Sequence, residues 1–169
     1  MRKSEIELLY DFNYWANRRI QEKAALLTPE QLHTSLVPGY GSLLDTLAHQ
    51  LGAEISWLTR LKQGVTLPKV PGREEYPDLP SILFRWEEQK QAMRAYLASL
   101  SDEALAQSFR YVTTKGKVYE MPRWELLMQL SNHGTQHRAE EAMLLTHFNQ
   151  SPGDMDFIFF LRETRGDTK

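Results

Sequence analysis

Two histidines four residues apart, His133 and His137, are the strongest sign of chemistry in this sequence. Four residues turn an α-helix by about 400°, so the two imidazoles lie on one face, about 6 Å apart along the axis. That spacing lets both rings reach one metal ion, as in the H-x-x-x-H part of helical zinc motifs. The surrounding apolar residues predict a core-facing register of Leu126, Leu130, His133, His137, Glu140, Leu144 and Phe148.

The pair alone leaves two interpretations open, because a buried histidine often hydrogen-bonds only a neighbour. Two core-facing imidazoles nevertheless bring two polar nitrogens, and an unpaired buried polar group costs about 1–3 kcal/mol. A shared cation would satisfy both. Glu140, one turn beyond His137, is a candidate catalytic residue that accepts a proton or orients a bound water. Its alternative role is that of a partly exposed or ion-paired helix residue.

A third ligand candidate, His49, lies in a separate predicted helix. Gly52 and Ala53 follow it at the next turn, and such small residues let another helix approach closely. However, His49 lies across its helix from the leucine stripe, so spacing alone leaves its role as a ligand open. Asp45 and Asn132 are candidates for hydrogen bonds that orient the ligands, although each is also a plausible cap or surface residue.

The remaining polar residues near these positions give weaker signals. Arg138 points about 100° away from His137, which suits an interface or surface residue as well as an anion clamp. His33 and His147 are predicted to lie at the surface. The four tryptophans are predicted to lie mainly in the core: Trp15, Trp57, Trp86 and Trp124.

Long helices must carry these side chains. Apolar residues recurring at three and four predict helices over about 4–27, 43–62, 81–100 and 122–148. Short helical turns are expected near Thr28 and Ser101, and a last short helix after a capping Asp154. The segment 109–119 alternates around Lys115-Gly116, which predicts a small β-hairpin.

The connection over residues 64–80 is rich in proline and glycine, and some helical bundles need such a long crossover. The sequence therefore predicts an all-α protein: an antiparallel four-helix bundle with a long crossover loop and a small β-hairpin before the fourth helix. A chain of 169 residues fits one domain, here residues 1–169.

Composition argues against several classes of function. The net charge of −2 provides no basic face for duplex nucleic acid. The chain has no cysteine, which excludes disulfides, zinc knuckles and a thiol nucleophile of its own. Neither a signal peptide nor the roughly 18 apolar residues of a membrane span is visible. We therefore expect a cytoplasmic protein without nucleic-acid or membrane partners.

Three segments resemble the DinB family of small metal-binding helical-bundle proteins. They are Tyr14-Trp15-Ala16-Asn17-Arg18-Arg19, then Leu47-Ala48-His49-Gln50 with Ala53-Glu54 and Trp57-Leu58, and finally Asn132-His133-Gly134-Thr135-Gln136-His137-Arg138. The order and spacing match over nearly the whole chain. Where the family pattern often continues with Gly-Gln, this chain has Ala139-Glu140, which adds a carboxylate near the histidines.

The resemblance implies a site in which His49, His133 and His137 hold zinc, nickel or a similar divalent transition metal. It also implies a homodimer. Three protein ligands leave a coordination position open, as in catalytic rather than structural zinc sites. A metal-dependent thiol S-transferase that uses a low-molecular-weight thiol such as bacillithiol, mycothiol or glutathione is one expectation, because the metal lowers the pKa of a ligated thiol. The alternatives are a metal-dependent hydrolase and a non-catalytic metal-binding stress-response or dimeric interaction protein.

Overall fold

The computed structural model describes residues 1–37 and 41–166 and is mostly helical, with two small antiparallel hairpins. The four long helices are α1 (Lys3–Ala24), α3 (Leu43–Gln63), α4 (Leu79–Ala98) and α6 (Arg123–His147). The shorter helices are α2 (Pro29–His33), α5 (Asp102–Ala106) and α7 (Phe157–Arg165). The strands are β1 (Ser35–Val37), β2 (Gly41–Ser42), β3 (Ser108–Val112) and β4 (Val118–Pro122).

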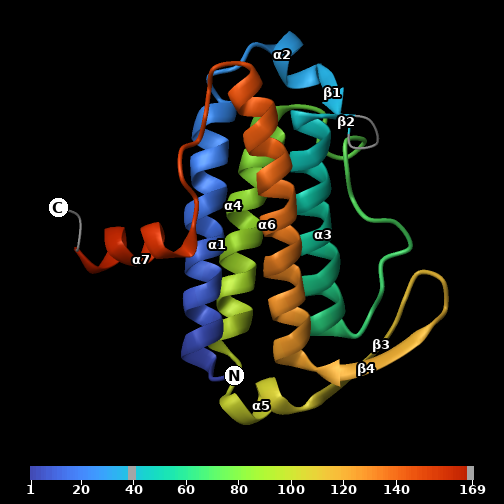
Figure 1. Cartoon of the computed structure of the whole chain (residues 1–169). Coiled ribbons are helices and arrows are strands. Elements are labelled where there is room, and N and C mark those ends of the chain that lie inside the picture. The colour runs from blue at the N-terminus through green and yellow to red at the C-terminus, as the bar shows by residue number, and fades with distance from the viewer. Residues whose placement is uncertain (38–40, 167–169) are drawn as a thin grey trace.

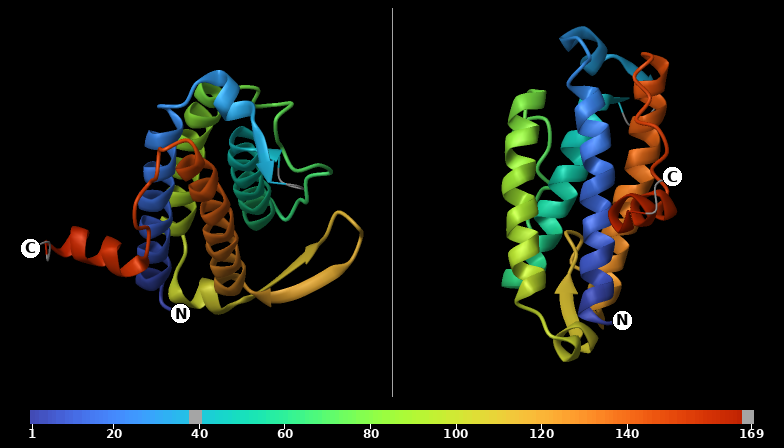
Figure 2. Two further views of the ribbon diagram at one scale, coloured as in Figure 1. Left: turned by 45° about the horizontal axis from the view of Figure 1, so that its top comes forward. Right: turned by 90° about the vertical axis from the view of Figure 1, so that its left-hand side faces the viewer.

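The four long helices stand side by side, as Figures 1 and 2 show. Helix α6 packs against α1 and α3, and α4 packs against the same two helices from the other side. The chain rises in α1 and α6 and descends in α3 and α4 (Figure 1). The sequence predicted an antiparallel bundle with a long crossover loop, and the structure shows that the helices on either side of this loop, α3 and α4, run in the same direction. The long connection after α3 makes this possible, since it carries the chain back to the end where α3 began.

The start and end of α3 follow the capping signals in the sequence. The Ser42 side chain accepts a hydrogen bond from the backbone N–H of Asp45, and the Asp45 carboxylate accepts one from the backbone N–H of Ser42. This reciprocal pair is a capping box with Asp in place of Glu. Gly64 ends the helix in the left-handed conformation, with φ of 70°. The predicted bounds of this helix are confirmed to within a residue.

The start of α4 agrees with the prediction, whereas the start of α7 does not. Helix α4 begins at Leu79, two residues before Ser81, and Asp78 caps it: the Asp78 carboxylate accepts from the backbone N–H of Ser81. Helix α7 follows Asp156, not Asp154. Its cap makes no side-chain hydrogen bond, so the first turn has no local signal that could distinguish the two aspartates.

The predicted hairpin is confirmed as β3–β4. Tyr111 lies opposite Tyr119 in the register, and their rings stack with centroids 5.8 Å apart. Tyr111 also packs edge-on against Trp57 of α3, at 5.4 Å. The hairpin is therefore held to the lower end of α3 by aromatic contacts (Figure 1). The second hairpin, β1–β2, was not predicted, because strands of three and two residues are too short to show alternation.

The crossover lies directly against α3. A Cβ added at Gly52 would lie 1.8 Å from the Pro71 carbonyl oxygen, so only glycine permits this approach. Gly52 is three residues after His49, one helical turn further along the helix. The small residue that the sequence analysis assigned to helix approach thus accommodates a loop instead.

The core consists of two apolar clusters separated by a polar layer. One cluster gathers around Leu47, Leu51 and Ile82, and the other around Tyr10, Met93 and Leu127. Between them lie buried polar side chains near the middle of all four long helices: Asn13, Asn17, Gln50, Glu54, Gln89, Arg138 and Glu141. Two carboxylates and one guanidinium are among them, so the layer must be largely neutralised from within.

Helix α7 stands apart from the other helices and projects from the side of α1 (Figures 1 and 2). Phe160 is buried against Phe12 and Trp15 of α1. Among the described residues, no helix is both long enough and apolar enough to cross a membrane.

The buried carboxylates predict a pH-dependent stability. Burial raises the pKa of Glu141 to about 8, whereas the unfolded chain has the ordinary value near 4.5. A group whose pKa is higher in the folded state stabilises that state. The stabilisation is complete at pH values below the pKa of the unfolded state, and it is lost as the pH rises towards the pKa of the folded state. Between pH 5 and 8 we expect the free energy of unfolding to fall by roughly 1 kcal/mol per pH unit from this group.

In Glu141→Gln this slope should become shallower, because the amide does not titrate. Urea unfolding from pH 5 to 8 measures it, with Glu22→Gln, an exposed position on α1, as the matched control. Parallel curves for Glu141→Gln and the unmodified protein would contradict the assignment.

Candidate metal site

The structure brings His49 of α3 together with His133 and His137 of α6. The ring centroids of His133 and His137 are 4.4 Å apart, and His49 lies 4.9 Å from His137 and 5.6 Å from His133. One nitrogen of each ring can be chosen so that all three lie within 4.8 Å of one another. The prediction that rings from two separate helices meet is therefore confirmed.

The spacing of these nitrogens fits a common cation. The Nε2 atoms of His133 and His137 are 3.2 Å apart. Two imidazole nitrogens bound tetrahedrally at about 2.0–2.1 Å from an ion are separated by about 3.3 Å. The donor set also suits a transition metal, because neutral imidazole is a ligand for Zn, Ni, Cu and Fe.

Exposure differs along the cluster in a way that matters for access. His137 is only 1% exposed, His133 is half-buried and His49 is exposed. The cluster is thus anchored in the core on the α6 side and reaches solvent on the α3 side. Solvent therefore reaches the cluster at His49.

Burial favours the neutral form of two of the imidazoles, those of His49 and His133. Burial lowers the pKa of His133 to about 4, and the positive charges that His137 and His49 would carry lower it further. Burial also lowers the pKa of His49, again with a contribution from His137. At neutral pH the lone pairs of these rings are therefore available, which is the form that binds metals.

Glu140 contacts the Nδ1 side of the His137 ring, whereas the Nε2 side faces His133. One carboxylate oxygen lies 2.7 Å from Nδ1 of His137. An ionised carboxylate only accepts hydrogen bonds, so Nδ1 carries the proton and Nε2, which faces His133, is left as an acceptor. This is the carboxylate–histidine arrangement that fixes the orientation of metal-binding rings. The contact of Glu140 is thus a hydrogen bond to His137, and its direct role in proton transfer stays a prediction.

Asp45 and Asn132 were considered as residues that orient the histidines, but their observed positions match the alternative roles. The Asp45 carboxylate accepts from the backbone and hydroxyl of Ser42 and lies 3.5 Å from the guanidinium of Arg73. Asp45 is therefore the helix cap that the sequence analysis gave as its alternative role. Asn132 is exposed on α6, which matches its alternative as a surface residue. His33 and His147 are exposed, as predicted.

The burial of Arg138 was not predicted from the sequence. This residue is 2% exposed, and its guanidinium donates to Asn13, Asn17 and Thr135. The interface, surface and anion-clamp roles considered for it are all replaced by a place in the polar layer. The available signal was the helical spacing of polar residues: Asn13 with Asn17, Gln50 with Glu54, and Arg138 with Glu141.

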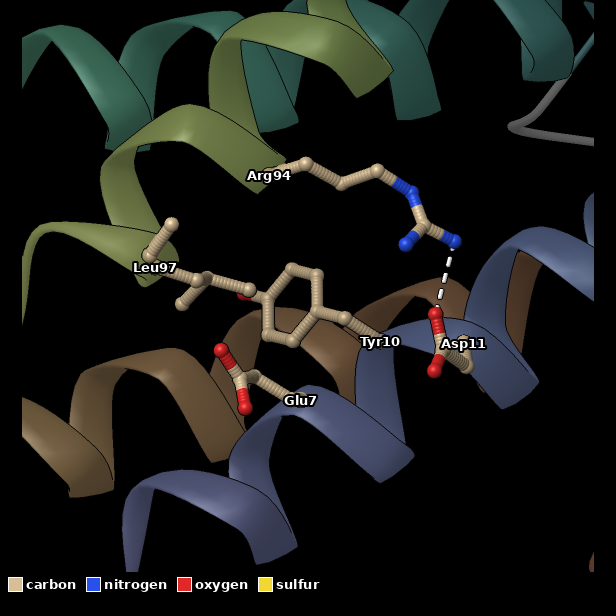
Figure 3. Close-up of a pocket in the computed structure, with 6 residues that line it drawn as sticks. Glu7, Tyr10, Asp11, Arg94 and Leu97 are labelled. Atoms are coloured by element: carbon tan, nitrogen blue, oxygen red, sulfur yellow. Dashed lines mark hydrogen bonds and ion pairs between the residues drawn. The ribbon is translucent and has the colours of Figure 1, made fainter.

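A hollow lies between α1 and α4, and none of the three histidines lines it (Figure 3). Its volume is about 330 Å³, and its lining consists of Glu7, Tyr10, Asp11, Arg94, Leu97 and Ala98. The Arg94 guanidinium donates to Asp11 at 2.6 Å, as the dashed line in Figure 3 marks. The charges of Arg94 and Asp11 are therefore paired with each other within the hollow.

Comparison with known proteins identifies relatives over the same length of chain. The family model described as "DinB family" matches residues 1–168. Protein DinB of Bacillus subtilis (strain 168) is 22% identical over 167 residues, covering 92% of this chain and 94% of that protein. The crystal structure of a DinB-like protein from Bacillus cereus ATCC 10987 has a TM-score of 0.62 at 20% identity, covering 83% of this chain and 91% of that one.

The contact between Glu140 and His137 predicts a fixed tautomer. In metal-free protein, we expect His137 to carry its proton on Nδ1, because that proton is held by the Glu140 carboxylate. In Glu140→Ala the population should shift towards the Nε2–H form. The ¹⁵N chemical shifts of the histidine rings measure this, and exposed His147 should be the same in both proteins. An unchanged His137 spectrum would show that Glu140 does not set the tautomer.

Proposed function

Because this chain belongs to the DinB family, we propose that it binds one divalent transition metal ion through His49, His133 and His137. The observation that carries this proposal is the convergence of three imidazole nitrogens from two helices within 4.8 Å. The four long helices, which we propose to class as a four-helix bundle, supply the frame for this convergence. Zinc or nickel is the proposed ion, since both accept neutral imidazole ligands.

We further propose that the site serves a metal-dependent thiol S-transferase. Three protein ligands leave one position open, and exposed His49 places that position within reach of solvent. The chain has no cysteine, so the sulfur would come from a low-molecular-weight thiol cosubstrate. When bound, the ion would supply Lewis acidity that lowers the pKa of this thiol.

The protein's own residues would contribute orientation and a place for a proton. Glu140 holds the ring of His137 through Nδ1, so Nε2 stays directed towards His133 and the rest of the cluster. Its carboxylate contacts the Nδ1 side of the His137 ring, away from the Nε2 side that faces His133, so it would act on a proton through that ring. The homodimer and the cytoplasmic location stay predictions.

Removing a ligand tests metal binding directly. We expect His137→Ala and His49→Ala each to weaken Zn²⁺ binding by more than about 100-fold, beyond the 10–100-fold cost of losing a residue behind a ligand. Competition against a chromophoric chelator measures the dissociation constant. His147→Ala is the matched control, because it removes an exposed histidine from the same helix and should bind like the unmodified protein.

Circular dichroism should show that all three variants keep their helix content. Undiminished zinc affinity in folded His137→Ala would refute the ligand assignment.

Transfer activity is tested with the zinc- and nickel-loaded protein. We expect it to consume glutathione or bacillithiol together with an electrophilic substrate, and we expect His49→Ala to be inactive. Loss of free thiol and appearance of the thioether, followed by mass spectrometry, measure the reaction. Metal binding without transfer across a panel of thiols and electrophiles would instead support the non-catalytic role.

A further inference from the structure

Each of the three histidines is followed in the chain by a buried residue, and two of these residues belong to the polar layer. Gln50 follows His49, Gly134 follows His133 and Arg138 follows His137. One residue turns a helix by about 100°, so a ring that faces the cluster is followed by a position that faces the interior. Gln50 is 4% exposed, Gly134 is buried and Arg138 is 2% exposed. The histidine cluster and the polar layer therefore lie on two adjacent faces of the same turns of α3 and α6.

A single oxygen joins the two helices that carry the histidines. Oδ1 of Asn17, on α1, accepts a hydrogen bond from Arg138 of α6 at 2.9 Å. The same oxygen accepts one from the Gln50 side-chain amide of α3 at 3.2 Å. Movement of α3 relative to α6 would break one of these bonds. This atom thus restrains both the separation and the register of the two helices.

The surrounding contacts reinforce this restraint. The Gln50 amide also lies 3.5 Å from the carbonyl oxygen of Gly134, a direct contact between α3 and α6. The Arg138 guanidinium donates to Asn13 at 2.5 Å and to Thr135 at 2.8 Å. Five N–H donors in a rigid plane let one arginine hold several acceptors at once.

Glycine at position 134 makes room for these contacts. A Cβ built there would lie 3.0 Å from Arg138 Nη1, 3.0 Å from Asn13 Oδ1 and 3.1 Å from Gln50 Nε2. Glycine in the middle of a helix is unfavourable in itself. Its presence here follows from the space that three side chains of the polar layer require.

The charge of Arg138 makes its position hard to change. An arginine side chain is always charged in proteins, and Arg138 is only 2% exposed. A buried charge that loses an acceptor is strongly destabilised, since water cannot replace the lost bond. The guanidinium is therefore held where all its acceptors are present.

From these contacts we propose that Arg138, Asn17 and Gln50 form a positioning unit that sets the register of α3 against α6, and thereby holds His49 opposite His133 and His137. None of the three touches the ion; they act through the helices. This inference rests on the proposed metal site, but the geometry that it concerns exists in the metal-free protein.

The experiment compares metal affinity with stability in matched variants. Arg138→Lys keeps the charge but loses the planar fork, so it cannot hold Asn13, Asn17 and Thr135 together. We expect Zn²⁺ binding, measured by chelator competition, to weaken about 10- to 100-fold. We also expect the visible absorption of bound Co²⁺ to change, because the arrangement of the histidines changes.

Gly134→Ala separates positioning from stability. Alanine favours the helix more than glycine does, so the urea midpoint should be kept or raised. The new Cβ displaces the polar side chains, so zinc affinity should still fall. A variant that is stable yet binds more weakly is not expected from a purely structural role.

Leu127→Ala is the converse control. Leu127 is fully buried in the other half of α6, so its truncation should lower the urea midpoint while the folded protein keeps its zinc affinity and Co²⁺ spectrum. The positioning role is overturned if Arg138→Lys and Gly134→Ala bind zinc like the unmodified protein. It is equally overturned if Leu127→Ala loses affinity to the same extent as they do.

A failure of the proposed metal binding can be distinguished from a failure of the positioning role. If the unmodified protein binds no metal, the metal site is wrong, and positioning is read instead from the nuclear Overhauser effect between the rings of His49 and His137 in metal-free protein. These rings are 4.9 Å apart by centroid. Loss of this signal in folded Arg138→Lys supports the positioning unit, and an unchanged signal overturns it.

Discussion

A guanidinium buried between helices must be surrounded by hydrogen-bond acceptors, and in this protein that requirement organises the centre of the molecule. Arg138 finds its acceptors on α1 and on its own helix, with the carboxylates Glu54 and Glu141 nearby. Apolar packing alone tolerates small shifts between helices, because dispersion is not directional. Hydrogen bonds to a fixed planar group tolerate them poorly. The polar layer therefore supplies specificity between two apolar clusters that supply most of the stability.

The same layer explains how the proposed metal site can lie at the edge of a helical core. His137 is held from behind by Glu140, and its helix is held from the inside by Arg138. His49 remains exposed, so the site opens to solvent without losing its rigid side. Rigidity on one side and access on the other are what a site needs to bind an ion and still admit a substrate.

Much of this architecture is local in origin and was predictable. Helix bounds follow from periodic apolar residues and from caps such as Ser42 and Gly64. The stacking of His133 above His137 follows from the helix repeat alone, so it needs no knowledge of the rest of the chain. The β3–β4 hairpin follows from alternation around a turn. Asp154 and Asp156 show the limit: with two capping residues close together, only the packing of Phe160 on α1 decides where α7 begins.

The amino-acid sequence by itself determined the helices, the hairpin and the pair of histidines on one face of α6, since each depends on contacts within a few residues. It did not determine that His49 faces that pair, that Arg138 is buried, or that α3 and α4 run in the same direction. Each of these depends on how one helix is rotated and placed against another. That placement results from the crossover and from the bonds of Asn17 to Gln50 and Arg138, which join residues distant in the chain. Only the tertiary structure could decide them.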